Sequence, residues 1–71
     1  MTRFTEDIME ALTDEWQTTT EVSVRTRRDL DLASHKAKVR HHLRQLYARG
    51  KVERRIVTAY GVEVRQWRRR Q

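Results

Sequence analysis

Residues 34–55, SHKAKVRHHLRQLYARGKVERR, decide the expected fold of the chain. The apolar positions in this stretch have the i, i+4, i+7 spacing of one helical face, and they are Val39, Leu43 and Leu46. Ser34 is a good N-cap residue, and Gly50 lies where a left-handed residue commonly ends a helix. This pattern predicts a helix over 34–49.

The residues after this helix, 51–68, are predicted to form a β-hairpin. Two β-rich runs, VERRIVT and VEVRQW, flank Ala59-Tyr60-Gly61, which suits a three-residue loop with glycine in the left-handed position. That register pairs two apolar residues and two arginines, namely Ile56 with Val64 and Arg55 with Arg65. Because like charges directly opposite each other destabilise a sheet, either the register differs by one residue or the arginines await an anion. The interval from Val64 to Trp67 breaks strict alternation and predicts a bulge or a strong twist near Gln66.

Two shorter elements are expected near the N-terminus. A helix over about 5–13 would have Thr5 as its N-cap, with Phe4 and Met9 at the spacing of a hydrophobic staple. Its apolar face consists of Ile8, Ala11 and Leu12. The tripeptide Trp16-Gln17-Thr18 is too short for an independent strand, so we expect it to pair with the hairpin and to place Trp16 in the core.

The segment over 18–28 has two competing patterns. Thr18 and Glu21 have the spacing of a capping box, which favours a helix from residue 19. The alternation of Val22 with Val24 among β-branched residues favours a strand. We predict the helix, because a cap is positional information whereas propensity is a weak preference. Asp29-Leu30-Asp31-Leu32 is then expected to form the turn before the next helix, with both leucines packing on the core.

The charge of the chain is strongly divided. Of 71 residues, 37% are charged and 37% are hydrophobic, and the formal net charge is +6. Residues 1–24 hold one basic and six acidic residues, whereas residues 25–71 hold fifteen basic and four acidic residues. This asymmetry indicates that the second part meets a polyanion, with a surface that serves solubility alone as the alternative. The length suits one domain over 1–71, with a structured core at about 4–68.

Several function classes lack the residues they need. The chain has no cysteine, which excludes disulfides, cysteine-based zinc sites and thiol catalysis. It has no apolar run of about 20 residues for a membrane span, and its acidic N-terminal residues do not resemble a signal peptide. His41 and His42 are adjacent and point about 100° apart, so we expect these residues and His35 to form no metal site. With no phosphate loop, serine elbow or paired carboxylates, we expect no enzyme, no cofactor, no small-molecule ligand and a cytoplasmic location.

The order of the expected elements resembles the winged helix-turn-helix. The resemblance rests on EVSVRTRRDLDLASHKAKVRHHLRQLYARGKVERR and VEVRQW, and above all on V-x-x-x-L-x-x-L-x-x-x-G-x-V-E-R-R from Val39 to Arg55. That run is similar to the end of a recognition helix entering a wing in MarR-like and ArsR-like regulators. The small size and the terminal Trp strand resemble FaeA-like regulators, although the Ala-rich E-[LI]-A segment of many relatives is absent. The expected fold class is α+β: a winged helix-turn-helix with three helices and a small antiparallel β-hairpin wing.

The face of the 34–49 helix opposite its apolar positions is the expected contact with DNA bases. Small residues precede long donors on this face, which would let the helix enter the major groove. The face carries Ser34, Ala37, Lys38, Arg40, His41, Arg44 and Gln45. The resemblance adds Lys36 to the base or phosphate contacts, and Arg44 offers a bidentate fork to guanine. An ordinary solvated basic face is the alternative.

Further basic residues are expected to contact phosphates or the minor groove. In the second helix they are Arg25, Arg27 and Arg28, whose alternative role is favourable placement near a helix C-terminus. In the wing and the tail the candidates are Arg54, Arg55, Tyr60, Arg65, Arg68, Arg69 and Arg70. A solvent-exposed loop aromatic is the alternative for Tyr60, and a frayed terminus is the alternative for the tail.

The sequence therefore predicts a protein that binds double-stranded DNA, a transcriptional regulator associated with the nucleoid when bound. One module buries only about 600–1,000 Å² on DNA, so a homodimer or a protein partner on the acidic first helix would raise the affinity. The alternatives are a winged-helix module for protein–protein contacts and an RNA-binding winged helix in which Tyr60 stacks on a base.

Overall fold

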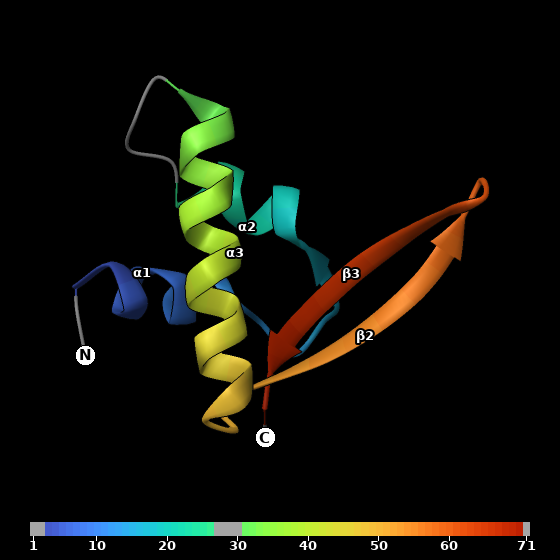
Figure 1. Ribbon diagram of the computed structural model, residues 1–71. Helices are drawn as coiled ribbons and strands as arrows, with labels where there is room; N and C mark the ends of the chain where they lie inside the picture. Colours follow the sequence, from blue (N-terminus) through green and yellow to red (C-terminus); the bar gives the residue numbers. More distant parts are fainter. Residues whose placement is uncertain (1–2, 27–30, 71) are drawn as a thin grey trace.

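A computed structural model of the chain describes residues 3–26 and 31–70. Its helices are α1 (Arg3–Ala11), α2 (Thr19–Arg25) and α3 (Leu32–Ala48), and its strands are β1 (Gln17–Thr18), β2 (Val52–Ala59) and β3 (Val62–Arg69) (Figure 1). The strands form one antiparallel sheet in the order β1-β3-β2. The expected α+β class, the three helices, the hairpin and the pairing of the short strand with it are confirmed.

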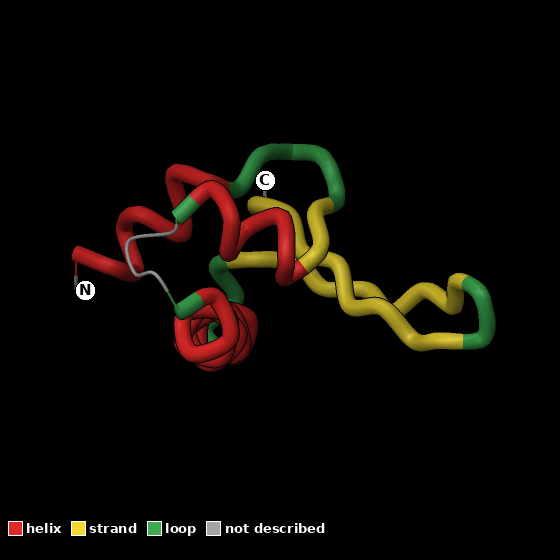
Figure 2. The backbone as a smooth tube through the Cα atoms, turned by 90° about the horizontal axis from the view of Figure 1, so that it is seen from above, coloured by secondary structure: helices red, strands yellow, loops and turns green. Residues whose placement is uncertain are grey.

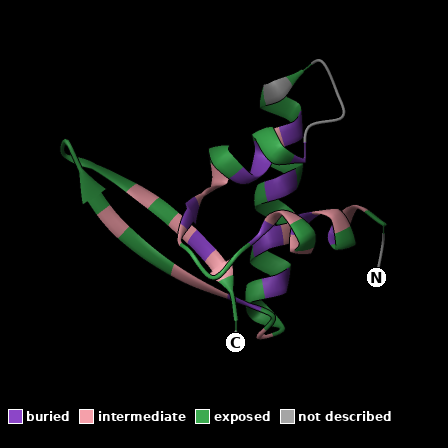
Figure 3. Ribbon diagram, turned by 180° about the vertical axis from the view of Figure 1, so that it is seen from behind, coloured by how far each residue is buried: buried purple, intermediate pink, exposed green. Residues whose placement is uncertain are grey.

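The core lies where α3 meets the base of the hairpin and the two shorter helices. Its fully buried apolar side chains are Ile8, Leu12, Val22, Val39, Leu43, Leu46, Val52 and Trp67. Figure 3 shows buried positions along one side of α3 and at the base of the hairpin, whereas the outer part of the hairpin has none. The three apolar positions that predicted α3 are therefore all in the core.

The tryptophan at the centre of this core is Trp67, and the expectation that Trp16 is a core residue is wrong. Trp67 is 0% exposed, and its Nε1 donates a hydrogen bond to Thr19 Oγ1 at 2.9 Å. Gln17 pairs with Trp67 across the sheet and is buried beside it. Because side chains alternate between the faces of a strand, Trp16 lies on the opposite face and is half-buried.

Helix α1 begins two residues earlier than expected and ends two residues earlier, at Ala11. Thr5 is buried inside the helix, so it is not the N-cap. Phe4 is also helical and packs its ring against His35 and His42, so the staple expected between Phe4 and Met9 is wrong. The aromatic contact with α3 explains the difference, because it draws the start of the helix onto the core.

Helix α2 has the predicted capping box, and the strand alternative for this segment is wrong. Thr18 Oγ1 accepts from the amide of Glu21 at 3.1 Å, and Glu21 Oε1 accepts from the amide of Thr18 at 3.2 Å. Val22 is buried whereas Val24 is 58% exposed, as helical rather than alternating periodicity requires. The helix ends at Arg25, and residues 27 and 28 of the expected helix lie outside the described residues.

Helix α3 begins at Leu32, and its N-cap is Asp31 rather than Ser34. Asp31 Oδ1 accepts from the amides of Ala33 and Ser34 at 3.1 and 3.3 Å, and the Ser34 hydroxyl donates to Asp31 Oδ2 at 2.8 Å. Hydrogen bonds from the hydroxyl and then the amide of Ser34 hold the pKa of the Asp31 carboxyl below its ordinary value. The second half of the turn expected at 29–32 is wrong, because Asp31 is the N-cap of α3 and Leu32 is the first residue of that helix. Asp29 and the side chains of both leucines lie outside the described residues.

The hairpin has a two-residue turn, Tyr60-Gly61, rather than the expected three-residue loop. Both residues have positive φ, 53° and 74°, which is the pattern of a type I′ turn. The register is therefore shifted by one residue, so that Arg55 faces Gln66, Ile56 faces Arg65 and Val57 faces Val64. This shift removes the expected pair of opposed arginines.

Of the bulge or strong twist expected near Gln66, the bulge is wrong, because the pairing of β2 with β3 runs unbroken from Val52–Arg69 to Ala59–Val62. At the other end of the hairpin, Gly50 follows Arg49, the C-cap of α3, and has φ 74°, so the left-handed glycine predicted there is confirmed.

Candidate nucleic-acid interface

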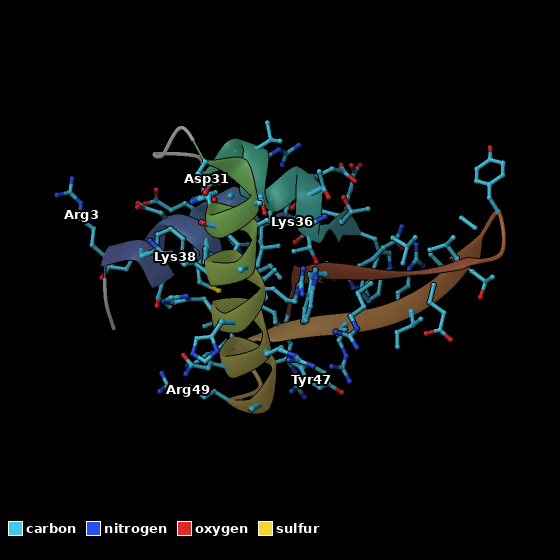
Figure 4. The ribbon with its side chains drawn as sticks, turned by 45° about the horizontal axis from the view of Figure 1, so that its top comes forward. Arg3, Asp31, Lys36, Lys38, Tyr47 and Arg49 are labelled. Atoms are coloured by element: carbon cyan, nitrogen blue, oxygen red, sulfur yellow. The ribbon has the colours of Figure 1, made fainter. Side chains whose placement is uncertain are left out.

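Helix α3 presents basic side chains on two sides rather than on one face. In Figure 4, Lys36 and Tyr47 point toward the side of the hairpin, whereas Lys38 and Arg49 point to the other side of the helix, where α1 lies. Successive residues of a helix are about 100° apart, so two lysines two positions apart diverge widely. The DNA-contacting face expected from the sequence was defined only as the side of α3 opposite the core. It therefore grouped residues that lie on different flanks of the helix.

The flank toward the hairpin carries Lys36, Arg40 and Arg44, which we call the basic stripe. Residues four apart on a helix are neighbours on the same side, so these three form a continuous row. Arg40 and Arg44 are exposed, and Lys36 is half-buried. Ala37, also exposed, lies next to this row and adds no bulk to it.

The start of the basic stripe borders a groove of about 440 Å³, which we call the hairpin-side groove. It lies between α3, the first turn of α2 and the middle of β3, and its lining residues are Thr18, Thr19, Thr20, Lys36, Arg40, Glu63, Val64 and Arg65. Three cations from two elements thus converge with threonine hydroxyls on one open concavity, against a single carboxylate. The side chains of Lys36, Arg40 and Arg65 make no hydrogen bond or ion pair within residues 3–26 and 31–70.

This groove suits a polyanion with a regular repeat of charges. Lysine and arginine grip phosphate oxygens, and threonine hydroxyls donate to them. The groove is open, so its cations keep their hydration until an anion displaces the water. Sequence reasoning missed the contribution of Thr18 to Thr20 and Glu63, although three consecutive threonines beside a capping box were a visible signal.

The other side of α3 holds the remaining predicted contacts of this helix, and two of them, His41 and Gln45, bond to each other. Gln45 Nε2 donates to His41 Nε2 at 3.2 Å, and His42 Nδ1 donates to the carbonyl of Lys38 at 2.8 Å. The His42 ring lies edge-on to Phe4 of α1, with ring centroids 4.7 Å apart. His42 therefore faces α1, whereas His41 and Gln45 are exposed, and none of the three lines the hairpin-side groove.

Three arginines of the hairpin stack on aromatic rings. Arg54 lies over Tyr47 at 4.2 Å and fastens β2 to α3. Arg55 and Arg68 both stack on Trp16, at 4.5 and 4.4 Å, on the other face of the sheet. Arg55 also donates to Gln66 Oε1, and Arg68 forms an ion pair with Glu53 at 3.1 Å. These contacts give the three predicted wing arginines a structural role that fixes the hairpin on the body.

Two other predicted phosphate contacts reach back to α1 and its C-terminal end. Arg25 donates to the carbonyl of Ala11 at 3.2 Å, and Arg69 donates to the carbonyl of Met9. Arg70 is exposed, and its guanidinium lies near Gly50. Arg27 and Arg28 lie outside the described residues. Tyr60 is fully exposed at the hairpin turn.

A second depression, of about 360 Å³, lies between α1 and the end of α3. It is lined by Glu6, Met9, Glu10, Leu46 and Lys51. Its floor is apolar and two of its rim residues are acidic, so it differs in chemistry from the hairpin-side groove.

The histidines occupy three different environments. The His35 ring is 1% exposed and bonds to Thr26 Oγ1 at 3.1 Å. Because that hydroxyl donates to the Val22 carbonyl, His35 Nε2 is the donor in this bond.

In the described part of the chain, no group of three His or carboxylate side chains has a metal-binding arrangement. Over the same residues, each helix is too short or too polar to cross a bilayer. Comparisons of the chain with protein-family models, with curated proteins and with solved structures found no match.

Proposed function

We propose that the chain is a winged helix that binds double-stranded DNA and acts as a transcriptional regulator, with the hairpin-side groove on the phosphate backbone. The observation that carries this proposal is the convergence of Lys36, Arg40 and Arg65, from α3 and β3, on one open groove. The element order and the strand order β1-β3-β2 support the winged-helix interpretation.

The basic stripe extends this interface along α3. The major groove of B-DNA is about 12 Å wide and admits one helix, and Ala37 beside the stripe lets the helix approach the base edges. Arg44, the exposed end of the stripe, offers the bidentate fork that guanine accepts. In this arrangement, the groove cations set the position on the backbone and Arg44 supplies sequence preference.

Salt dependence tests the proposal directly. We expect labelled mixed-sequence duplex to bind at about 50 mM salt, with log K falling against log salt by about 0.9 for each phosphate neutralised. Replacing Lys36, Arg40 or Arg65 by alanine should each reduce that slope by about 1. Binding of the duplex would be followed by fluorescence anisotropy between about 50 and 200 mM salt.

Lys38→Ala and Arg49→Ala are matched controls, because each removes one positive charge from the other flank of α3. We expect their slopes to stay near that of the unmodified chain. An equal loss in all five variants would contradict the groove as the site and leave only general charge attraction. If the unmodified chain does not bind at 50 mM salt, the DNA proposal fails, and the depression between α1 and α3 becomes the candidate site for a basic protein segment.

A further inference from the structure

The turn of the hairpin contains a tyrosine whose backbone conformation and solvent exposure both lower the stability of the fold. Tyr60 has φ 53°, a left-handed conformation that bulky side chains rarely adopt. Asparagine is the preferred residue at this position of a type I′ turn, directly before the glycine. The Tyr60 side chain is also 105% exposed, so the ring makes no compensating contact within the described chain.

The residues around Tyr60 carry no charge. The run IVTAYGV, over 56–62, has no acidic or basic side chain, and Ile56 and Val62 are 50% and 61% exposed. The turn and the outer part of β2 are therefore neutral and apolar, and the nearest charges across the hairpin are those of Glu63 and Arg65 on β3, which face Thr58 and Ile56. Arginine is the residue that a narrow minor groove favours, and the turn has none. The chemistry of the turn is therefore better suited to contact with an aromatic surface than with a phosphate.

We propose that Tyr60 stacks on an unpaired base, so that the protein prefers duplex DNA interrupted by a short unpaired segment to continuous duplex. This inference rests on the proposed DNA-binding function and deepens it. In a continuous duplex, each base face is covered by its neighbours, and an inserted side chain must first separate them. At an unpaired segment the base faces are already accessible, and the ring gains stacking without that cost.

The shape of the molecule allows both contacts at once. The hairpin extends well beyond the helices, away from α1 (Figures 1 and 2). Arg65 in the groove and Tyr60 at the turn are five residues apart along β3 and the turn, which spans about 16 Å. With one nucleotide per about 3.4 Å along each strand, that reach corresponds to about five base pairs. Groove cations on the duplex would therefore place the ring about five base pairs away.

The experiment compares a continuous duplex of about 25 base pairs with the same duplex carrying a central two-nucleotide bubble, one bubble base being 2-aminopurine. We expect the unmodified chain to bind the bubble about tenfold more tightly, with quenching of 2-aminopurine fluorescence as the ring stacks. Tyr60→Phe should keep the preference and the quenching. Tyr60→Ala and Tyr60→Asn should bind the bubble no better than the duplex, with unchanged affinity for the duplex.

Tyr60→Asn also controls for folding, because Asn-Gly is the favoured sequence of a type I′ turn. We expect this variant to melt at or above the temperature of the unmodified chain while losing the preference. Equal affinity of the unmodified chain for both probes, or a preference that survives Tyr60→Asn, would overturn the inference and leave the proposed function intact. Tighter binding of a single-stranded RNA of the bubble sequence would overturn it in favour of RNA. No salt-dependent binding of either DNA probe would reject the proposed function itself.

Discussion

The two tryptophans stabilise the fold by different means. Trp67 is completely buried and bonded to Thr19, whereas Trp16 is half-buried and stacks with the guanidinium groups of Arg55 and Arg68. A chain of 71 residues has about 4–11 kcal/mol of net stability. Removing a large buried aromatic therefore threatens the whole fold, while removing a stacked surface ring does not.

We expect Trp67→Ala to lower the free energy of unfolding by about 3–5 kcal/mol, since it leaves a large cavity. Trp16→Ala should lower it by about 1–2 kcal/mol, the scale of two exposed cation–π contacts. Urea denaturation followed by circular dichroism measures both values. A larger loss for Trp16 than for Trp67 would contradict the assignment of the core.

Asp31 makes the stability of α3 depend on pH. The pKa of Asp31 is lowered in the folded state, chiefly by the Ser34 hydroxyl. The contribution of Asp31 to the stability of the fold is therefore complete above the ordinary aspartate pKa of about 3.9, and it is lost as pH falls through the lowered pKa. We expect Asp31→Ala to melt at a lower temperature than the unmodified chain at pH 7, with the difference shrinking at acid pH. Asp31→Asn keeps a good N-cap at neutral pH and should lack this dependence. Melting curves between pH 2 and 7 would show equal differences at all pH values if the cap were unimportant.

At the scale of elements, the sequence predicted what depends on neighbours along the chain. The capping box of α2 and the apolar spacing of α3 act over three to seven residues, and both are confirmed. The register of the hairpin was missed because it depends on the backbone of the turn, and a tyrosine in a left-handed conformation gives no sequence signal for a type I′ turn.

The candidate site was predicted only in part, for a related reason. A helical projection distinguishes the buried side of α3 from the exposed side, but it does not say which flank the hairpin covers. The hairpin lies beside Lys36 and Tyr47, so the groove selects Lys36 and Arg40 and excludes Lys38. Stacking of Arg54, Arg55 and Arg68 on aromatic rings likewise depends on contacts between distant segments.

Glu63 is the one carboxylate among the residues that line the hairpin-side groove, and it opposes binding of an anion there. We expect Glu63→Gln to raise affinity for duplex DNA by about two- to fivefold at low salt, the scale of one exposed charge interaction. Glu10→Gln makes the same charge change on α1 and should have a smaller effect. Anisotropy titrations at about 50 mM salt compare the two variants, and equal gains would point to net charge rather than to the groove.

For the molecule as a whole, the acidic first helix lies apart from the basic hairpin-side groove. Helix α1, with Glu6 and Glu10 exposed, lies on one side of α3, and the hairpin extends on the other side (Figures 1 and 2). The carboxylates of α1 repel a polyanion, whereas the cations of the hairpin-side groove attract it. The charge distribution therefore orients the approach of a ligand before any contact forms.

The sheet order β1-β3-β2 leaves β2 with no strand along its outer side within the described residues. Every second amide of that strand therefore points to water and exchanges its hydrogen without unfolding, while the alternate amides are held by β3. Near the helices, Glu53, Arg54 and Arg55 discourage another chain from adding a strand there. Farther out, Ile56 to Ala59 carries no charge, so this outer half is where concentrated protein would begin to form intermolecular sheet.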